Sequence, residues 1–243
     1  MTQMSAKPAY GIDAPGVIRN LFLFGVACLL IGLLAPPSID IGPVNLSVQS
    51  FLWVAGALLA AAGLMLLYAL HGKFAHRDRM LALHAWRGDE QVLDVGTGRG
   101  LMLVGAARRL SSGRAIGLDV WNKEDLSGNS LQSTEHNLQL EAVTDRCSLV
   151  SESAQKMSFA DGAFDVIVSN LCLHNIYDQA ARHQACAEIV RVLKPGGVAI
   201  ISDYKLTREY AKLFRATGLN VERKPANWLT TFPPLSIVIA RKR

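Results

Sequence analysis

The stretch LDVGTGRG, residues Leu93–Gly100, decides the fold of this chain. It sets three glycines at alternate positions behind an aspartate, and it continues a short apolar run, residues 91–95, that is typical of a buried strand. Glycine has no side chain, so a turn rich in glycine lets the backbone approach a ligand closely. The stretch therefore predicts a strand, a ligand-binding turn and a helix that begins near Leu101.

Strands and helices are predicted to alternate along the chain after this turn. Alternation at this spacing favours an α/β fold, in which a parallel sheet is covered by helices on both faces. Ligands in such sheets bind beyond the carboxyl ends of the strands, where the strand order reverses. The predicted strands are 91–95, 115–120, 147–150, 164–169, 198–202, 220–223 and 235–240, and the predicted helices are 101–110, 130–141, 179–193 and 206–217.

Two uncharged apolar runs, residues 21–35 and 51–70, precede this domain. The second has the length of about 20 residues that a helix needs to cross the hydrocarbon core, and the first reaches a similar length when it is extended to 17–35. These runs predict two transmembrane helices. A membrane hairpin is therefore expected over residues 1–72 and an α/β domain over residues 73–243.

Basic residues flank the two runs, whereas the loop between them, residues 36–50, has none. By the positive-inside rule, both termini and the α/β domain are expected in the cytoplasm and the loop outside. A cleaved signal peptide fits poorly, because two prolines follow the first run directly and no A-x-A site is present. A buried helical hairpin of a soluble protein remains the alternative. The flanking basic residues are Lys7, Arg19, Lys73, Arg77 and Arg79.

The net charge of +5 does not by itself indicate a nucleic-acid partner. The basic residues are scattered and lack the interleaved aromatic residues of nucleic-acid-binding surfaces, so no nucleic acid is expected. Attraction to anionic membrane lipid accounts for such a charge as well. The four cysteines have no metal-like spacing, so no metal site is expected.

Two ligands are compatible with such a glycine turn, a nicotinamide dinucleotide and S-adenosylmethionine. The dinucleotide fingerprint is G-x-G-x-x-G, whereas Gly96, Gly98 and Gly100 give G-x-G-x-G. Asp94 stands two residues before the first glycine, where a negative charge opposes a pyrophosphate but suits the ammonium of a methionine group. The order VLDVGTGRG, residues 92–100, resembles the first motif of class I S-adenosylmethionine-dependent methyltransferases.

The resemblance extends over about residues 75–243 and implies a Rossmann-like seven-stranded sheet with S-adenosylmethionine as the cofactor. AIGLD ends in Asp119, where the family keeps an acid that binds the ribose hydroxyls. SESAQKMSF resembles the third-strand loop, with Ser153 in place of the family's acid, so that a hydroxyl takes the contact to the adenine amino group. FDVIVSN and EIVRVLKPGG resemble the fourth strand and the helix and turn before the fifth. The implied cofactor-binding residues are Asp94, Gly96, Thr97, Gly98, Gly100, Asp119, Val120, Trp121, Ser153, Ala154 and Asn170.

Methyl transfer from a sulfonium needs alignment in a site that excludes water, and it needs a base only when the acceptor loses a proton. The fourth strand is followed by LCLHNIY, which lacks the D/N-P-P-Y signature of enzymes that methylate amide or adenine nitrogens. His174 on this loop is the candidate catalytic base, because the pKa of histidine lies near neutrality. The residues expected to line the acceptor pocket are Tyr177, Asp203, Tyr204 and Trp228.

The stretch WNKEDLSGNS, residues 121–130, lengthens the connection after the second strand and predicts a lid. Almost no insertion follows the fifth strand, so the hairpin and an amphipathic helix predicted over 74–86 are left to cover the acceptor. This favours a small lipophilic or membrane-associated acceptor with a hydroxyl, a thiol or an activated carbon, and contact with membrane lipid. Two alternatives stay open: a non-catalytic membrane scaffold that binds S-adenosylmethionine, and an NAD(P)-dependent oxidoreductase, since Asp119 also suits the ribose of NAD.

Overall fold

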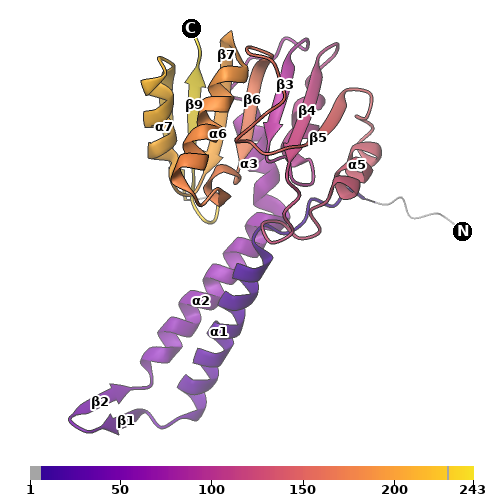
Figure 1. The fold of residues 1–243 in the computed structure, drawn as a ribbon. Coiled ribbons are helices and arrows are strands. Elements are labelled where there is room, and N and C mark those ends of the chain that lie inside the picture. The colour runs from indigo at the N-terminus through magenta and orange to yellow at the C-terminus, as the bar shows by residue number, and fades with distance from the viewer. Residues whose placement is uncertain (1–6, 229) are drawn as a thin grey trace, which may run out of the picture.

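The computed structural model describes residues 7–228 and 230–243, so residues 1–6 of the expected hairpin segment lie outside it. Figure 1 shows an α/β domain from which a long hairpin of two helices projects. The strands of the main sheet are β3 (Gln91–Val95), β4 (Arg114–Asp119), β5 (Cys147–Ser151), β6 (Phe164–Asn170), β7 (Leu193–Asp203), β8 (Asn220–Asn227) and β9 (Leu235–Arg241). Their order is β5-β4-β3-β6-β7-β9-β8, which places the reversal of strand order between β3 and β6.

The sheet is mixed, because β9 is antiparallel to both of its neighbours, β7 and β8. The other six strands run in one direction. The expected α/β fold is confirmed, but the expectation of a wholly parallel sheet is wrong at β9. The reason is the short connection 228–234, since a parallel neighbour needs a crossover of about a dozen residues or more, whereas a short loop closes an antiparallel pair.

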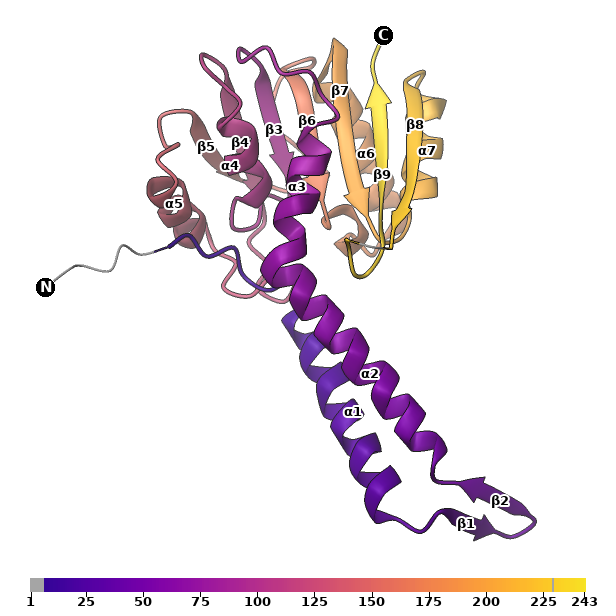
Figure 2. The same ribbon diagram turned by 180° about the vertical axis from the view of Figure 1, so that it is seen from behind.

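Helices cover both faces of this sheet, as Figure 2 shows with α3 and α4 in front of it and α6 and α7 behind. One face packs against α3 (Lys73–Leu81), α4 (Leu101–Ala107) and α5 (Leu131–Leu140). The other packs against α6 (Gln179–Val192) and α7 (Thr207–Ala216). Two apolar cores result, one on each face, and burial of this apolar surface is the main stabilising contribution to the domain.

The projecting hairpin consists of α1 (Pro15–Leu34), α2 (Ser50–Leu67) and a short two-stranded tip, β1 (Ser38–Ile41) and β2 (Val44–Ser47). Both helices are long and apolar enough to cross a membrane, and only 6% and 11% of their most apolar windows are buried. The core helices of a soluble protein are mostly buried, and these two helices are not. The two helices pack closely, because glycines of α1 face leucines of α2. These pairs are Gly25 with Leu59 and Gly32 with Leu52.

The hairpin joins the domain through one continuous helix, in which α2 runs through the π-helical turn η1 (Tyr68–Gly72) into α3. The separate helix expected over 74–86 is therefore wrong in both bounds. It is a continuation of α2, and it ends at Leu81, whose carbonyl accepts a hydrogen bond from the Trp86 indole at 2.7 Å. In Figure 2 the arrowheads of β3 and β7 point toward the hairpin, so the carboxyl ends of the parallel strands face it.

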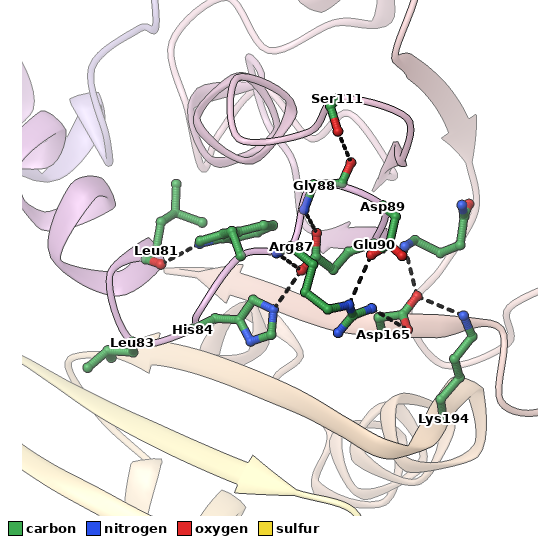
Figure 3. A network of polar contacts seen from close by, with 12 residues as sticks. Leu81, Leu83, His84, Arg87, Gly88, Asp89, Glu90, Ser111, Asp165 and Lys194 are labelled. Atoms are coloured by element: carbon green, nitrogen blue, oxygen red, sulfur yellow. Dashed lines mark hydrogen bonds and ion pairs between the residues drawn. The ribbon is translucent and has the colours of Figure 1, made fainter.

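The opposite, amino end of the sheet is fixed by a polar network (Figure 3). Glu90, directly before β3, is fully buried and accepts hydrogen bonds from the backbone N–H groups of Arg87 and Gly88 at 2.6 and 2.8 Å. At the start of β6, Asp165 accepts a hydrogen bond from Lys194 at 2.7 Å. These contacts satisfy the carboxylates within the protein, and they hold the entry to β3 in place.

Candidate functional site

The glycine turn after β3 forms the floor of the site. Gly96, Gly98 and Gly100 have φ values of 74°, 53° and 85°, a left-handed conformation that glycine adopts without a steric penalty. A Cβ atom on Gly96 would also overlap the side chain of Cys172, which follows β6. The turn therefore needs glycine for two reasons, its backbone conformation and its close contact with the neighbouring loop.

Asp94, near the end of β3, is 1% exposed, yet only one of its oxygens has a partner. The Thr97 hydroxyl donates a hydrogen bond to Oδ2 at 2.8 Å, whereas Oδ1 has no hydrogen-bond partner among the described residues. Burial raises the pKa of this carboxyl to about 7, and the nearby Asp119 adds to the rise against the opposing effect of Thr97. A buried carboxylate with a free oxygen fits a cationic donor such as an ammonium group.

Asp119, at the end of β4, connects the glycine turn to the loop that follows β4. Its carboxylate accepts hydrogen bonds from the backbone N–H groups of Gly98 at 2.7 Å and Trp121 at 2.6 Å, and from the Asn129 amide at 3.5 Å. An ionised carboxylate has about four acceptor positions, so it keeps capacity, chiefly on Oδ2, to accept from a ligand hydroxyl. The Trp121 indole donates to the Ser151 hydroxyl at 2.7 Å, and Val120 is largely exposed.

The remaining predicted cofactor residues follow β5 and β6. The Ser153 hydroxyl accepts a hydrogen bond from the backbone of Gln155 at 3.2 Å, and Ala154 is buried in the apolar core. At the end of β6, the side-chain oxygen of Asn170 is buried and has no hydrogen-bond partner among residues 7–228 and 230–243. All of these residues stand at carboxyl ends of neighbouring strands, as the sequence patterns predict.

His174 lies on the short helix η2 (Leu173–Asn175) after β6 and is held by Asp203 at the end of β7. Its Nδ1 is 2.8 Å from Oδ1 of Asp203, without the alignment of a hydrogen bond, and its backbone N–H donates to Oδ2 at 3.2 Å. Asp203 is fully buried and also accepts hydrogen bonds from the Tyr204 backbone and the Tyr210 hydroxyl. Asp203 thus contacts His174 from the buried side and, contrary to the prediction, does not line an open pocket.

The other expected pocket residues do not gather around His174. Tyr177 and Trp228 are 83% and 76% exposed. Trp228 lines a shallow surface groove beside α3 with Ala75 and Arg79, and the groove contains none of the other predicted site residues. Tyr204 is the exception, because its ring makes an edge contact with the His174 ring at 4.8 Å between centroids.

The loop 121–130, the lid loop, folds over the glycine turn. The Leu126 side chain lies over Gly98, where an added Cβ would be 2.9 Å away. Residues 7–14, the N-terminal strap, run along the outside of this loop. Ile12 exchanges two hydrogen bonds with Ser127, at 2.7 and 3.0 Å, and Ala14 N–H donates to the Asp125 carbonyl at 3.0 Å.

The sequence patterns do not predict the strap, because residues 7–14 have neither periodicity nor a motif. Its anchor is Lys73, which is 4% exposed and donates to the carbonyls of Tyr10 and Gly11 at 2.9 and 2.5 Å. A lysine immediately after an apolar run is the only signal for this role, and it indicates a membrane boundary equally well. Helix α1, which begins at Pro15, is thereby connected directly to the cover of the site.

Part of the domain resembles known proteins in sequence. Residues 93–201 match the family model described as "Methyltransferase domain". A demethylmenaquinone methyltransferase from Lactiplantibacillus plantarum is 35% identical over 121 residues, which are 49% of this chain and 47% of that protein. The chain thus spans about half the length of the curated relatives that it matches.

Two solved structures share the fold. An O-methyltransferase family protein from Burkholderia thailandensis has a TM-score of 0.60 at 16% identity, over 93% of this chain and 71% of that one. The [4+2]-cyclase SpnF has a TM-score of 0.59 at 17% identity, over 96% and 98% of the two chains. The second likeness shows that this fold also supports a reaction other than methyl transfer, so the chemistry must be argued from the site.

Proposed function

We propose that this chain, which belongs to the class I S-adenosylmethionine-dependent methyltransferases, is a membrane-anchored enzyme that methylates a small lipophilic acceptor. The observation that carries the proposal is the direction in which the site faces. The carboxyl ends of the parallel strands point toward the apolar hairpin (Figure 2), and the glycine turn and His174 directly follow two of these strands, β3 and β6. A site in this position meets the membrane surface if the hairpin spans the bilayer.

The residues of the carboxyl end fit S-adenosylmethionine. The free oxygen of Asp94 suits the ammonium of the methionine group, and Asp119 retains acceptor positions for the ribose hydroxyls. Trp121 supplies an aromatic face beside the strand β5, where the adenine would stack. When bound, this cofactor supplies an electrophilic methyl group on a positively charged sulfur. An oxidoreductase fits less well, since Asp94 would oppose a pyrophosphate.

We assign His174 as the base that removes a proton from the acceptor. The contact between its Nδ1 and Asp203 leaves Nε2 free to take that proton. Asp203 is a positioning residue, because it orients the ring and stabilises the imidazolium that forms, as the third group of a catalytic triad does. The lid loop and the strap keep water away from the reacting atoms, which favours transfer to the acceptor over loss to solvent.

The membrane topology is part of the proposal. Helices α1 and α2 span the bilayer, with the α/β domain and both termini in the cytoplasm and the loop 36–50 outside. A reporter fused after Arg243 should be active only in the cytoplasm. Activity only on the outer side would overturn the orientation, and release of the protein by high salt alone would exclude a spanning hairpin.

The acceptor class follows from the membrane hairpin, and the similarity to a demethylmenaquinone methyltransferase supports it. Incubation of the full chain in membranes with methyl-labelled S-adenosylmethionine should yield a labelled product that extracts into organic solvent. The matched control is Asp94→Asn, which keeps the shape of the side chain and removes its charge. A protein that binds the cofactor but labels no lipid, quinone or thiol fraction would support the alternative, a non-catalytic scaffold.

A further inference from the structure

A tyrosine hydroxyl is buried without a partner where the membrane hairpin meets the site. Tyr68 is the first residue of the π-helical turn η1 and is 4% exposed. Its hydroxyl has no hydrogen-bond partner among the described residues. Leaving a buried hydroxyl unpaired costs free energy that phenylalanine would avoid, so an unpaired hydroxyl here indicates a ligand. π-Helical turns are also frequent at functional sites.

The polar neighbours of this hydroxyl come from two other elements of the site. They are Asn170 at the end of β6 and Asp13 in the strap. Among the described residues, Oδ1 of Asn170 is buried and also lacks a hydrogen-bond partner within bonding geometry, whereas Oδ2 of Asp13 lies 3.6 Å from Nζ of Lys73 in an ion pair. One donor, one acceptor and an ion-paired carboxylate from three separate elements therefore converge here. A ligand hydroxyl between them can accept from Tyr68 and donate to Asn170.

The position of Tyr68 in the helix shows from which side such a ligand arrives. Below it, toward the tip of the hairpin, the helix exposes the leucines Leu64 and Leu67. The ring itself is fixed, because it packs against Gly72, where a Cβ would lie 2.9 Å from the Tyr68 ring. An apolar surface thus leads along the hairpin to a fixed, unpaired hydroxyl at the edge of the site.

We propose that the Tyr68 hydroxyl, with Asn170 and Asp13, binds the oxygen-bearing head group of an amphipathic acceptor whose tail lies along the hairpin. The acceptor class is a lipid with a phenolic or enolic hydroxyl. This inference rests on the proposed function. Tyr68 donates to an oxygen of the head group, Asn170 accepts from its hydroxyl, and Asp13, paired with Lys73, borders the head group. The head group is thereby held on the same side of the sheet as His174.

The test uses Tyr68→Phe in the full chain, with Tyr177→Phe as the matched control. Tyr177 is 83% exposed, and its side chain does not gather around His174. In the binding arm, a hydroquinone with an isoprenoid tail is added to the detergent-solubilised protein with S-adenosylmethionine, and the unfolding temperature is measured. The hydroquinone should raise the unfolding temperature of the parent and of Tyr177→Phe, and should lose this effect in Tyr68→Phe. No rise in the parent, or an equal rise in Tyr68→Phe, overturns the inference.

In the activity arm, a membrane lipid extract is titrated with methyl-labelled S-adenosylmethionine. Tyr68→Phe should need about tenfold more extract for half-maximal labelling, the loss expected for one buried hydrogen bond. Its affinity for S-adenosylmethionine should match that of the parent. A weakened cofactor affinity would instead assign the hydroxyl to the cofactor and overturn the inference. Hydroquinone binding without any labelling would leave the head-group site in place and refute the proposed methyl transfer.

Discussion

The two ends of strand β3 each carry a buried carboxylate, and the two carboxylates differ in their hydrogen-bond partners and in the direction of their pKa shifts. Glu90, before the strand, accepts two backbone hydrogen bonds and lies 3.1 Å from Nε2 of His84. Burial alone would raise its pKa, but these hydrogen bonds outweigh burial and hold the pKa below its usual value. Asp94, near the end of the strand, has one partner, and its pKa is raised to about 7, chiefly by burial.

The two ends of the sheet differ in whether the protein itself supplies partners for its buried polar atoms. At the amino end the protein supplies every contact that its buried charges need (Figure 3). At the carboxyl end it leaves polar atoms without partners, and a ligand must supply the missing contacts. Among the described residues, the atoms left there without a hydrogen-bond partner include the Tyr68 hydroxyl, Asp94 Oδ1, Asn129 Oδ1 and Asn170 Oδ1.

The largest effect is expected at the carboxyl end, for His174→Ala. Loss of a base lowers turnover by about 10²–10⁴-fold, and the affinity for S-adenosylmethionine should stay unchanged. Labelled methyl transfer and calorimetry measure the two quantities. His183→Ala is the matched control, because His183 lies against Glu209 on α7, away from the glycine turn. Equal activity of the His174 variant and the parent would show that His174 is not the base.

At the amino end, Glu90→Gln should lower stability and leave cofactor binding intact. An amide presents a donor where the carboxylate accepts from backbone N–H groups, so a loss of about 3 kcal/mol is expected in chemical denaturation. Asp89→Asn, at an exposed neighbour, is the control. Because the folded-state pKa of Glu90 is depressed, its contribution is present above the unfolded-state value and is lost as pH falls through the folded-state value. A stability difference between parent and Glu90→Gln that stays constant on acidification would contradict this.

A smaller effect is expected for the cover of the site. Lys73→Met keeps the apolar stem of the side chain but removes the donors to Tyr10 and Gly11. Opening of the strap should become easier by about 2 kcal/mol, which hydrogen exchange of the strap amides measures. Lys123→Met, at an exposed lysine of the lid loop, should leave this exchange unchanged. Unaltered protection in Lys73→Met would show that the strap does not depend on this contact.

Features of the structure also differ in how well the sequence predicts them. The predicted strand 91–95 coincides with β3, because an apolar run closed by a glycine turn is a purely local signal. The predicted helix 130–141 likewise matches α5 to within one residue, and its N-cap Ser130 accepts a hydrogen bond from Ser133 N–H at 3.1 Å, which is also a local contact. Local patterns of this kind account for nearly all strands and helices of the domain.

Local sequence patterns do not predict contacts between segments that are distant in the chain. The pairing of His174 with Asp203 depends on the ends of β6 and β7 lying side by side, and no spacing in the sequence encodes it. Lys73 meets the strap across more than sixty residues of chain, with a separation of 62 to Gly11. Motifs predict the proposed cofactor-binding residues, whereas Tyr68 lies inside an apolar run and no motif marks it.

We expect S-adenosylmethionine to supply the contact that Asp94 lacks. Its dissociation constant, measured by calorimetry across a range of pH, tests this most directly. Below a pKa of about 7, the Asp94 carboxyl of the free protein is protonated and cannot pair with an ammonium. The dissociation constant should therefore rise about tenfold for each pH unit from 7 down to 5.5, and Asp94→Asn should abolish this slope. A dissociation constant that is independent of pH in the parent, or a slope that persists in Asp94→Asn, would contradict the account.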